Sequence, residues 1–389
     1  MKKILPAICG INGDGFASMA LKSDGTVWAW GNNDRGQLGD GTKRKRNFPA
    51  QVKELDEVIA IAPRQALRSD GTVWCWGYNR EGQCGDGTNS PRLTPVQVKD
   101  LYGVKAIYAG TAVRDDGTVW TWGHNNYGQL GDGTTKNRRN PVQVKNLDKI
   151  KEVSCTLALR EDGTVWEWGT NCLEIIPLPR RVPHLENVVA ISKFFSSYAL
   201  KEDGTVWAWG QNISGRLGDG TDIDRYEPIM VKGLDRIIAI STGSSHQLAL
   251  RHDGTVWVWG GNLYGQFGNG TFIEDDDIVN GCPHSLVLPT QIQGLNDVIA
   301  VSAGTQHSLA LKSDGTIWAC GRNIDGELGD GTKYSLKYNI NLRGGVGSSD
   351  MFFRDLVGKN RKNEIVPVSK YVPIQVVGIE KEDFIDLLN

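Results

Sequence analysis

The sequence predicts an all-β protein built as one closed array of seven repeated units. The first reason is a motif, Asp-Gly-Thr followed by Val-Trp or Ile-Trp, that recurs at intervals of 41 to 61 residues. Periods of about 20–50 residues are typical of propellers and other repeat arrays. The seven copies begin at Asp24, Asp70, Asp116, Asp162, Asp203, Asp253 and Asp314.

The second reason is a proline motif that recurs in step with the first. Its form is Pro-x-x-Val or Pro-x-x-Ile, followed two or three residues later by an aliphatic residue. Its seven copies begin at Pro49, Pro95, Pro141, Pro179, Pro228, Pro289 and Pro373. Because both motifs run from the start of the chain to its end, we expect one domain over residues 1–389 rather than several.

The third reason is that each repeat contains four short apolar runs. In the sixth repeat these cover residues 237–241, 246–250, 255–260 and 289–292. All four are rich in Val, Ile, Leu or aromatic residues and are bounded by Gly, Asp, Asn or Pro, which is the signature of strands. Asp-Gly between the second and third runs suits a tight hairpin, since glycine accepts positive φ at little cost.

The third run of each repeat carries two Trp separated by one residue, except in the seventh, where Cys320 replaces the second Trp. Side chains two apart on a strand share one face, so we expect both rings to fill the wedge between neighbouring sheets. A buried Trp contributes about 4–6 kcal/mol as an upper bound. We therefore predict that the Trp of this strand are buried in every repeat.

Composition excludes several classes of protein. The net charge is -2, from 43 basic and 45 acidic residues, so the chain has no bulk positive field for nucleic acid. It has no run of 18 apolar residues that would span a membrane. The seven cysteines show no Cys-x-x-Cys spacing and replace small or apolar residues of the repeat, as Cys75 and Cys84 do. They indicate buried thiols and a reducing, cytoplasmic location.

Catalysis and metal binding have little support in the sequence. Histidines occur at unlike repeat positions, except that His246 and His307 both begin the second strand of their repeat. We interpret this pair as structural. We expect no catalytic residues, no metal and no cofactor, and therefore no enzyme activity. The six histidines are His124, His184, His246, His252, His284 and His307.

The repeat resembles that of the regulator of chromosome condensation family. The motifs that carry this resemblance are DGTVWAWGNNDRGQLGDGT (residues 24–42), the Pro-x-Gln-Val-x-x-Leu element, and VIAVSAGTQHSLALKSDG (residues 298–315). The resemblance covers about residues 8–379. It implies a seven-bladed β-propeller in which each blade is a four-stranded antiparallel sheet. It does not fix a function, because the family includes an exchange factor for a small GTPase and β-lactamase inhibitor proteins.

The chain departs from its own repeat between the third and fourth strands. The distance from the Gly that ends the third strand to the Pro of the fourth is 18 residues in four repeats, 10 in the fourth, 29 in the sixth and 52 in the seventh. We expect insertions at about residues 272–288 and 333–372. In an up-and-down sheet this connection and the first turn lie at one end, so the variation falls on one face of the disc. Insertions on one face often mark the binding face.

Charge on that face is uneven. The segment 333–372 carries eight basic and three acidic residues, and its neighbour in a closed ring, the first repeat, carries Lys-Arg-Lys-Arg at 43–46. The bland interpretation is solvated loops, and the alternative is an asymmetric docking surface with an apolar anchor. The predicted partner-binding residues are Lys43, Arg44, Lys45, Arg46, Met351, Phe352, Phe353, Lys359, Arg361 and Lys362.

These observations favour a monomeric, non-catalytic scaffold that binds a protein partner on the face with the insertions. The rival functions are a guanine-nucleotide exchange factor for a small GTPase, a nucleic-acid binder and an enzyme inhibitor. Nucleic acid is not favoured as a partner, and no membrane is expected.

Both chain ends are candidates for the first strand of the first blade. A gapless count back from Leu21 against Leu311 places Ile8 on Val298. Residues 384–387 also follow the last proline motif at about the distance where a first strand should begin. We expect the C-terminal run to pack beside the first blade.

Overall fold

We describe the protein from a computed structural model. The structure describes residues 8–9, 17–170, 174–270, 285–332, 357–359, 365–367 and 369–377. Side chains are described for residues 17–170, 174–270, 285–332 and 373–377.

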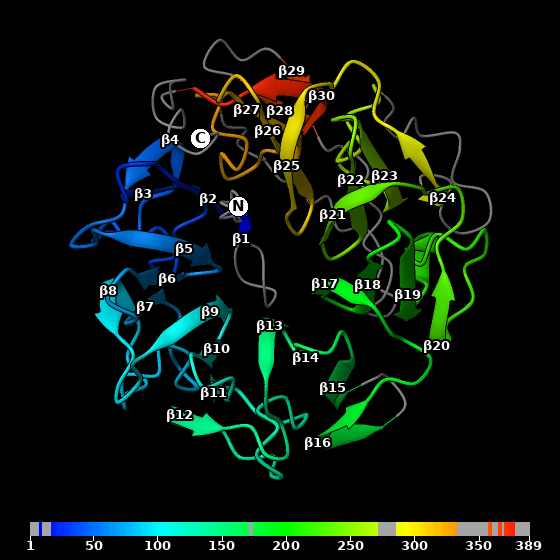
Figure 1. The fold of residues 1–389 in the computed structure, drawn as a ribbon. Coiled ribbons are helices and arrows are strands. Elements are labelled where there is room, and N and C mark those ends of the chain that lie inside the picture. Colours follow the sequence, from blue (N-terminus) through cyan, green and yellow to red (C-terminus); the bar gives the residue numbers. More distant parts are fainter. Residues whose placement is uncertain are drawn as a thin grey trace, which may run out of the picture.

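Seven four-stranded antiparallel sheets stand in a ring, which confirms the seven-bladed β-propeller (Figure 1). From the centre to the rim we call the strands of a blade A, B, C and D. The A strands are β1 (Ile8–Cys9), β5 (Val58–Ala62), β9 (Val104–Tyr108), β13 (Ile150–Ser154), β17 (Val188–Lys193), β21 (Ile237–Thr242) and β25 (Val298–Ala303). The B strands are β2 (Ala17–Leu21), β6 (Gln65–Arg68), β10 (Thr111–Arg114), β14 (Leu157–Arg160), β18 (Ser196–Lys201), β22 (His246–Arg251) and β26 (His307–Lys312).

The outer two strands complete each blade. The C strands are β3 (Val27–Gly31), β7 (Val73–Gly77), β11 (Val119–Gly123), β15 (Val165–Thr170), β19 (Val206–Gly210), β23 (Val256–Gly261) and β27 (Ile317–Arg322). The D strands are β4 (Arg46–Gln51), β8 (Arg92–Gln97), β12 (Arg138–Gln143), β16 (Ile175–Arg181), β20 (Arg225–Met230), β24 (Ser285–Gln291) and β30 (Ser369–Gln375). A separate hairpin, β28 (Val357–Lys359) and β29 (Ile365–Pro367), precedes β30, and a 3-10 turn, η1 (Ile213–Gly215), lies in blade 5.

The D strands begin earlier than their apolar residues indicate. In the sixth repeat the expected strand was 289–292, whereas β24 begins at Ser285. A register shift separates the two halves of each of these strands from the C strand, for example between Ala29 and Gly31 in blade 1. A rim strand tolerates both this bulge and a proline, because its outer edge needs no ladder partner.

The A–B turn and the C–D connection of a blade lie at the same end of the sheet. In blade 6 the amide of Gly261 donates to the carbonyl of Ser245 at 2.7 Å, and in blade 7 that of Arg322 donates to Gln306 at 2.9 Å. We call this end the C–D face, and the opposite end, with the Asp-Gly turns, the Asp-Gly face. The C–D connection has 14 residues in blades 1, 2, 3 and 5 but four in blade 4. Its variation therefore falls on one face, as predicted.

The second Trp of the C strand fills the seam between two blades. These side chains are buried in all six blades that have them, and their indole N–H groups reach back to the preceding blade. Trp76, for example, donates to the carbonyl of Gln37 in blade 1 at 2.8 Å. This confirms the wedge-filling role for Trp30, Trp76, Trp122, Trp168, Trp209 and Trp259.

The first Trp of each pair is half-buried, so the prediction that both rings are buried is wrong for this position. In blade 1 the indole N–H of Trp28 donates to Oγ1 of Thr26 at 3.2 Å, and the ammonium of Lys22 lies 4.5 Å from the ring centroid. The ring lies next to the Asp-Gly turn, where the next blade no longer covers it. Solvent exposure and a cation–π contact take the place of burial.

Each blade is made from one continuous segment, so no shared strand closes the ring. Blades 7 and 1 are joined by side chains instead. The indole N–H of Trp30 and the hydroxyl of Ser18 both donate to the carbonyl of Glu327, at 2.8 Å each. Trp30 also packs in one apolar cluster with residues of blade 7 such as Leu309 and Leu328. Closure here is by packing and hydrogen bonds between the first and last blades.

The N-terminal strand occupies the A position of blade 1, but not in the expected register. Ile8 pairs with Ser18, whereas Val298 pairs with Lys312 at the other end of strand B in blade 7. Ile8 therefore corresponds to Ala303, the partner of Ser308, and its gapless placement on Val298 is wrong. The reason is a longer A–B connection in blade 1, which a gapless count ignores. Residues 384–387 lie outside the described residues.

Candidate partner-binding face

The C–D loops share an internal frame that fixes their shape. In blade 1 the amide of Asn33 donates to Asp40, to the carbonyl of Thr42 and to the carbonyl of Arg44, at 3.1–3.2 Å. Its carbonyl oxygen accepts from the amide of Leu38 at 3.0 Å. Asn79, Asn125 and Asn212 make the equivalent bonds in blades 2, 3 and 5. The repeated Asn is therefore a structural cap of the loop, as the sequence suggested.

Two of the four predicted cations in blade 1 are engaged within the fold. Arg46 pairs with Asp40 at 2.7 Å, and Arg92, Arg138 and Arg225 make the same pair with Asp86, Asp132 and Asp219 in their blades. These contacts hold the pKa of the four aspartates below the usual range despite their burial. Lys45 pairs with Asp325 of blade 7 at 2.5 Å and lies 3.7 Å from Asp34.

The other two, Lys43 and Arg44, are exposed. Exposed cations also lie on the C–D loops or outer strands of blades 2 and 3. Arg139 of blade 3 adjoins the loop of blade 2 that carries Arg80, because the amide of Gly87 donates to its carbonyl at 3.0 Å. None of these side chains forms an ion pair with another described residue. We call the set the basic arc: Lys43, Arg44, Arg80, Lys136 and Arg139.

Sequence reasoning missed the last three members of the basic arc. They are single residues in separate repeats, and no charge run marks them. They become one surface only because blades 1 to 3 stand side by side with their C–D loops on the same face (Figure 1).

The predicted residues of the seventh insertion cannot be placed on this face. Met351, Phe352, Phe353, Arg361 and Lys362 lie outside the described residues, and Lys359 ends β28 without a described side chain. Their role in binding stays a prediction. Of the sixth insertion, residues 271–284 also lie outside, and Ser285–Leu288 belong to β24.

The seam between blades 4 and 5 is built differently, because blade 4 has no long C–D loop. Elsewhere the wedge Trp donates to a loop carbonyl, but the indole N–H of Trp209 donates to Oε2 of Glu167 at 3.2 Å. Glu167 stands in β15 where other blades have a small or apolar residue or Thr. Its other oxygen accepts from Arg180 at 3.0 Å, and Arg180 also pairs with Glu174 at 2.6 Å. A buried carboxylate thus replaces the missing loop.

We predict that Glu167→Ala lowers the free energy of unfolding by about 2 kcal/mol, because it leaves the buried indole N–H of Trp209 without an acceptor. Glu174→Ala is the matched control, since Glu174 is exposed and pairs with the same arginine. It should change stability by less than about 0.5 kcal/mol. Chemical denaturation of both variants measures this, and equal values would show that Glu167 does not serve the seam.

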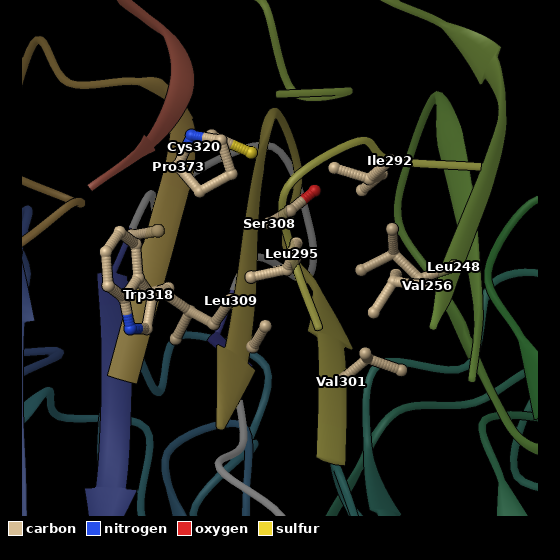
Figure 2. Close-up of a pocket in the computed structure, with 12 residues that line it drawn as sticks. Leu248, Val256, Ile292, Leu295, Val301, Ser308, Leu309, Trp318, Cys320 and Pro373 are labelled. Carbon is tan, nitrogen blue, oxygen red and sulfur yellow. The ribbon is translucent and has the colours of Figure 1, made fainter. Parts of the chain in front are cut away.

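The seam between blades 6 and 7 lacks the wedge Trp. Cys320 takes its place, and Phe267 stands where blades 1, 3, 5 and 7 have Leu38, Leu130, Leu217 and Leu328. Figure 2 shows the result, a small apolar cavity of about 10 Å³ bordered by Leu248, Val256, Ile292, Trp318 and Pro373, with the sulfur of Cys320 at its edge. This volume is about that of one water-sized probe, so the larger Phe267 has compensated for the smaller cysteine.

Restoring the consensus residue should therefore destabilise the protein. We predict that Cys320→Trp lowers the free energy of unfolding by about 1–3 kcal/mol, because the indole must displace Phe267 or Pro373. The double variant Cys320→Trp/Phe267→Leu should recover most of the loss. Thermal denaturation of the two variants decides this, and a stabilised single variant would contradict the packing argument.

The two histidines that begin β22 and β26 bridge seams. The hydroxyl of Ser308 donates to the carbonyl of Gln266 at 2.7 Å, so its oxygen accepts from Nε2–H of His246 at 2.8 Å. In the same way Ser18 accepts from His307 at 2.9 Å. Burial lowers the pKa of both imidazoles to about 3, so both are neutral at physiological pH. Buried, neutral rings fixed between blades serve the fold, in line with the sequence interpretation.

The ring encloses a cavity of about 470 Å³, lined by the A strands of blades 2 to 7. Its polar groups join neighbouring strands. Oγ of Ser154 accepts from the amide of Lys193 at 3.0 Å, and Oγ of Ser241 accepts from that of Ala303 at 2.9 Å. These bonds hold adjacent blades together and do not converge on a common point.

Within the described ranges, no cluster of His, Cys, Asp or Glu is suited to hold a metal ion. No helix in the described part of the chain is long and apolar enough to cross a membrane.

Models of the regulator of chromosome condensation (RCC1) repeat match residues 24–62, 70–112, 116–156, 203–250 and 253–311, and a second model of this repeat matches residues 9–37, 237–266 and 298–327. The structure of yeast RCC1 (Prp20) bound to Kap60 is similar, with a TM-score of 0.71 and 20% identity over 95% of this chain and 87% of that chain. Prp20p from Saccharomyces cerevisiae, whose structure is described together with its binding to Gsp1p and histones, gives 0.69 and 20% over 92% and 87%.

Human WBSCR16 gives a TM-score of 0.66 and 20% identity over 80% of this chain and 87% of that chain. The Protein RCC2 homolog of Danio rerio is 34% identical over 55 residues, which are 14% of this chain and 11% of that protein.

The fold and its loop frame define a closed β-propeller of seven single-segment blades. The repeat matches span more than half of the chain. The chain belongs to the regulator of chromosome condensation repeat family.

Proposed function

We propose that this chain is a non-catalytic scaffold that binds a protein partner on its C–D face, with the basic arc receiving an acidic surface of that partner. The observation that carries the proposal is the set of five exposed cations, without ion pairs among the described residues, on three consecutive blades. Other basic residues of the same loops, Lys45 and Arg46, are engaged with carboxylates. Unpaired surface cations accelerate and orient the encounter with an acidic partner.

Two further observations support a binding role. The C–D loops are rigid frames of hydrogen bonds, so the cations on them are held on a preorganised surface. The propeller relatives with printed partners, Prp20 with Kap60 and Prp20p with Gsp1p and histones, bind proteins. We propose a cytoplasmic location and a monomeric chain on the sequence arguments alone.

Charge reversal tests the proposal. Lys43→Glu, Arg44→Glu and Arg139→Glu together should weaken binding of the purified partner at least tenfold and leave the melting temperature unchanged, because all three side chains are exposed. Adding Lys359→Glu and Arg361→Glu tests whether the seventh insertion extends the surface. The matched control is Lys105→Glu/Lys151→Glu, two exposed cations on inner strands near the Asp-Gly face. Equal loss in that control would contradict a basic-arc interface.

The partner is found by affinity capture with the full chain followed by binding measurements with purified components. Binding that disappears on nuclease treatment would give nucleic acid as the ligand. Release of labelled nucleotide from a small GTPase, measured in the same preparations, would give the exchange-factor alternative. Inhibition of a captured enzyme would give the inhibitor alternative.

A further inference from the structure

Each long C–D loop covers the outer strand of the next blade. At five seams a loop glycine donates its amide N–H to a carbonyl of the neighbouring D strand, and each bond is 3.0 Å long. The loop thereby satisfies a backbone acceptor that would otherwise lie open at the rim. The five pairs are Gly41 with Leu93, Gly87 with Arg139, Gly133 with Pro177, Gly220 with Val287 and Gly331 with Asn47.

Blade 5 lacks this cover. The C–D connection of blade 4 has four residues and closes a hairpin between Thr170 and Ile175, which pair with each other. Tyr226 of β20 holds the position that Leu93 and Arg139 hold in blades 2 and 3, one residue after the arginine that pairs with the C strand glycine. Its carbonyl accepts no hydrogen bond from another described residue. An unfilled place for a loop therefore lies over blade 5, beside β16 (Figure 1).

Apolar side chains border this place. Phe195 comes from the A–B turn, Ile213 and Ile223 from the C–D loop and Tyr226 from β20, with exposed fractions of 53, 57, 57 and 51%. Arg216 ties the first two together, since its guanidinium lies 5.6 Å from the ring centroid of Phe195 and its Nε donates to the carbonyl of Ile213 at 3.0 Å. We call Phe195, Ile213, Ile223 and Tyr226 the blade 5 patch. Clustered apolar side chains with such exposure are typical of interaction sites.

The charge around the blade 5 patch is acidic. Asp222 and Glu227 are exposed and form no ion pair with a described residue. The nearby cations are engaged, Arg225 with Asp219 at 2.9 Å and Arg180 with Glu167 at 3.0 Å. The patch therefore suits a ligand that is apolar and basic, opposite in charge to the ligand of the basic arc.

The form of the ligand follows from the other seams. There the place is filled by a turn that offers one N–H to the strand carbonyl. Pro228 interrupts the row of N–H groups two residues after Tyr226, which disfavours pairing with a long added strand. A turn meets the geometry and a strand does not.

We propose that the blade 5 patch is a docking site for a surface turn of a protein partner, a turn that carries basic and apolar side chains and donates a backbone N–H to the carbonyl of Tyr226. The inference rests on the proposed scaffold function and adds a second contact on the same face. A partner with an acidic region over blades 1 to 3 and a basic turn over blade 5 can bind in one orientation only.

The test uses the full chain and a phage-displayed library of disulfide-closed 12-residue peptides as the probe. We expect selection of peptides that combine Lys or Arg with aliphatic or aromatic residues. Tyr226→Ala should weaken the best synthesised peptide at least tenfold. So should a variant in which residues 171–174 are replaced by the 14-residue connection 124–137 of blade 3, because the new loop fills the place in cis. Tyr127→Ala, an exposed aromatic residue in a loop of the same face, is the matched control and should not change binding.

The loop replacement is checked by thermal unfolding, and Ile223→Ser provides a second exposed-site variant if it fails to fold. No enrichment, or peptides that bind the loop-replaced chain equally well, would overturn the proposal. Enriched acidic peptides that lose binding in Lys43→Glu/Arg44→Glu but not in Tyr226→Ala would support the basic arc and reject the blade 5 site. Peptides that depend on Tyr226 and not on the basic arc would support the site independently of the proposed function.

Discussion

Trp209→Ala is expected to lower the free energy of unfolding by about 3–5 kcal/mol. The ring is buried between blades 4 and 5, in one cluster with Leu157, Val188 and Ala199. Its removal leaves a cavity that the adjacent sheets cannot close, and it leaves the buried carboxylate of Glu167 without one of its donors. Denaturant unfolding with a single probe of the whole ring measures the loss.

Trp120→Ala is the matched control, because Trp120 is the first Trp of its pair and is half-buried against Arg114. We expect about 1–2 kcal/mol for this variant, since less apolar surface is lost and solvent can refill the site. If both variants lost the same stability, the wedge position would have no special role. If Trp209→Ala lost none, the wedge argument itself would be wrong.

Acid is expected to destabilise the propeller through its two seam histidines. The pKa of His246 and His307 falls to about 3 on folding because both rings are buried. For a base with a lowered folded-state pKa, the stabilising contribution is present above its unfolded pKa of about 6.5 and is lost as the pH falls toward 3. Each histidine contributes a slope of about 1.4 kcal/mol per pH unit, so the pair removes about 4 kcal/mol between pH 6.5 and 5.

Glu327 acts in the opposite direction. Burial raises its pKa to about 7, although Arg322 beside it favours the charged form. An acid with a raised folded-state pKa contributes stability that is present below its unfolded pKa and lost as the pH rises through 7. Protonation of Glu327 therefore returns about 2 kcal/mol between pH 6.5 and 5, and the wild type should show a net loss of about 2 kcal/mol.

Variants separate the two contributions. Glu327→Gln should steepen the loss between pH 6.5 and 5 to about 4 kcal/mol. His246→Ser/His307→Ser, with the residue that stands at Ser196 in blade 5, should reverse its sign. Urea unfolding at pH 5, 5.75 and 6.5 gives these slopes. The paired aspartates do not interfere, because their pKa values lie below 3.8. Parallel slopes in all three proteins would contradict the assignment.

The sequence by itself determined the architecture. Two motifs in step, each present seven times, define seven blades, and period-2 patterns within them define the strands. Up-and-down connectivity then places every C–D connection on one face, whatever its length. These features depend on local residue order and on repetition, both of which can be read from a linear chain. Even the odd fourth, sixth and seventh repeats were visible, because each departs from a rule the others keep.

Only the tertiary structure decided which side chains are free to bind. Lys43, Arg44, Lys45 and Arg46 form one charge run, yet Arg46 is held by Asp40 and Lys45 by Asp325, 280 residues away. Arg80, Lys136 and Arg139 joined the same surface from other repeats. Glu167 gained its role because the neighbouring blade presents an indole N–H where a loop is missing. Each of these outcomes depends on a contact across a seam, and the partner across a seam is set by how the closed ring packs.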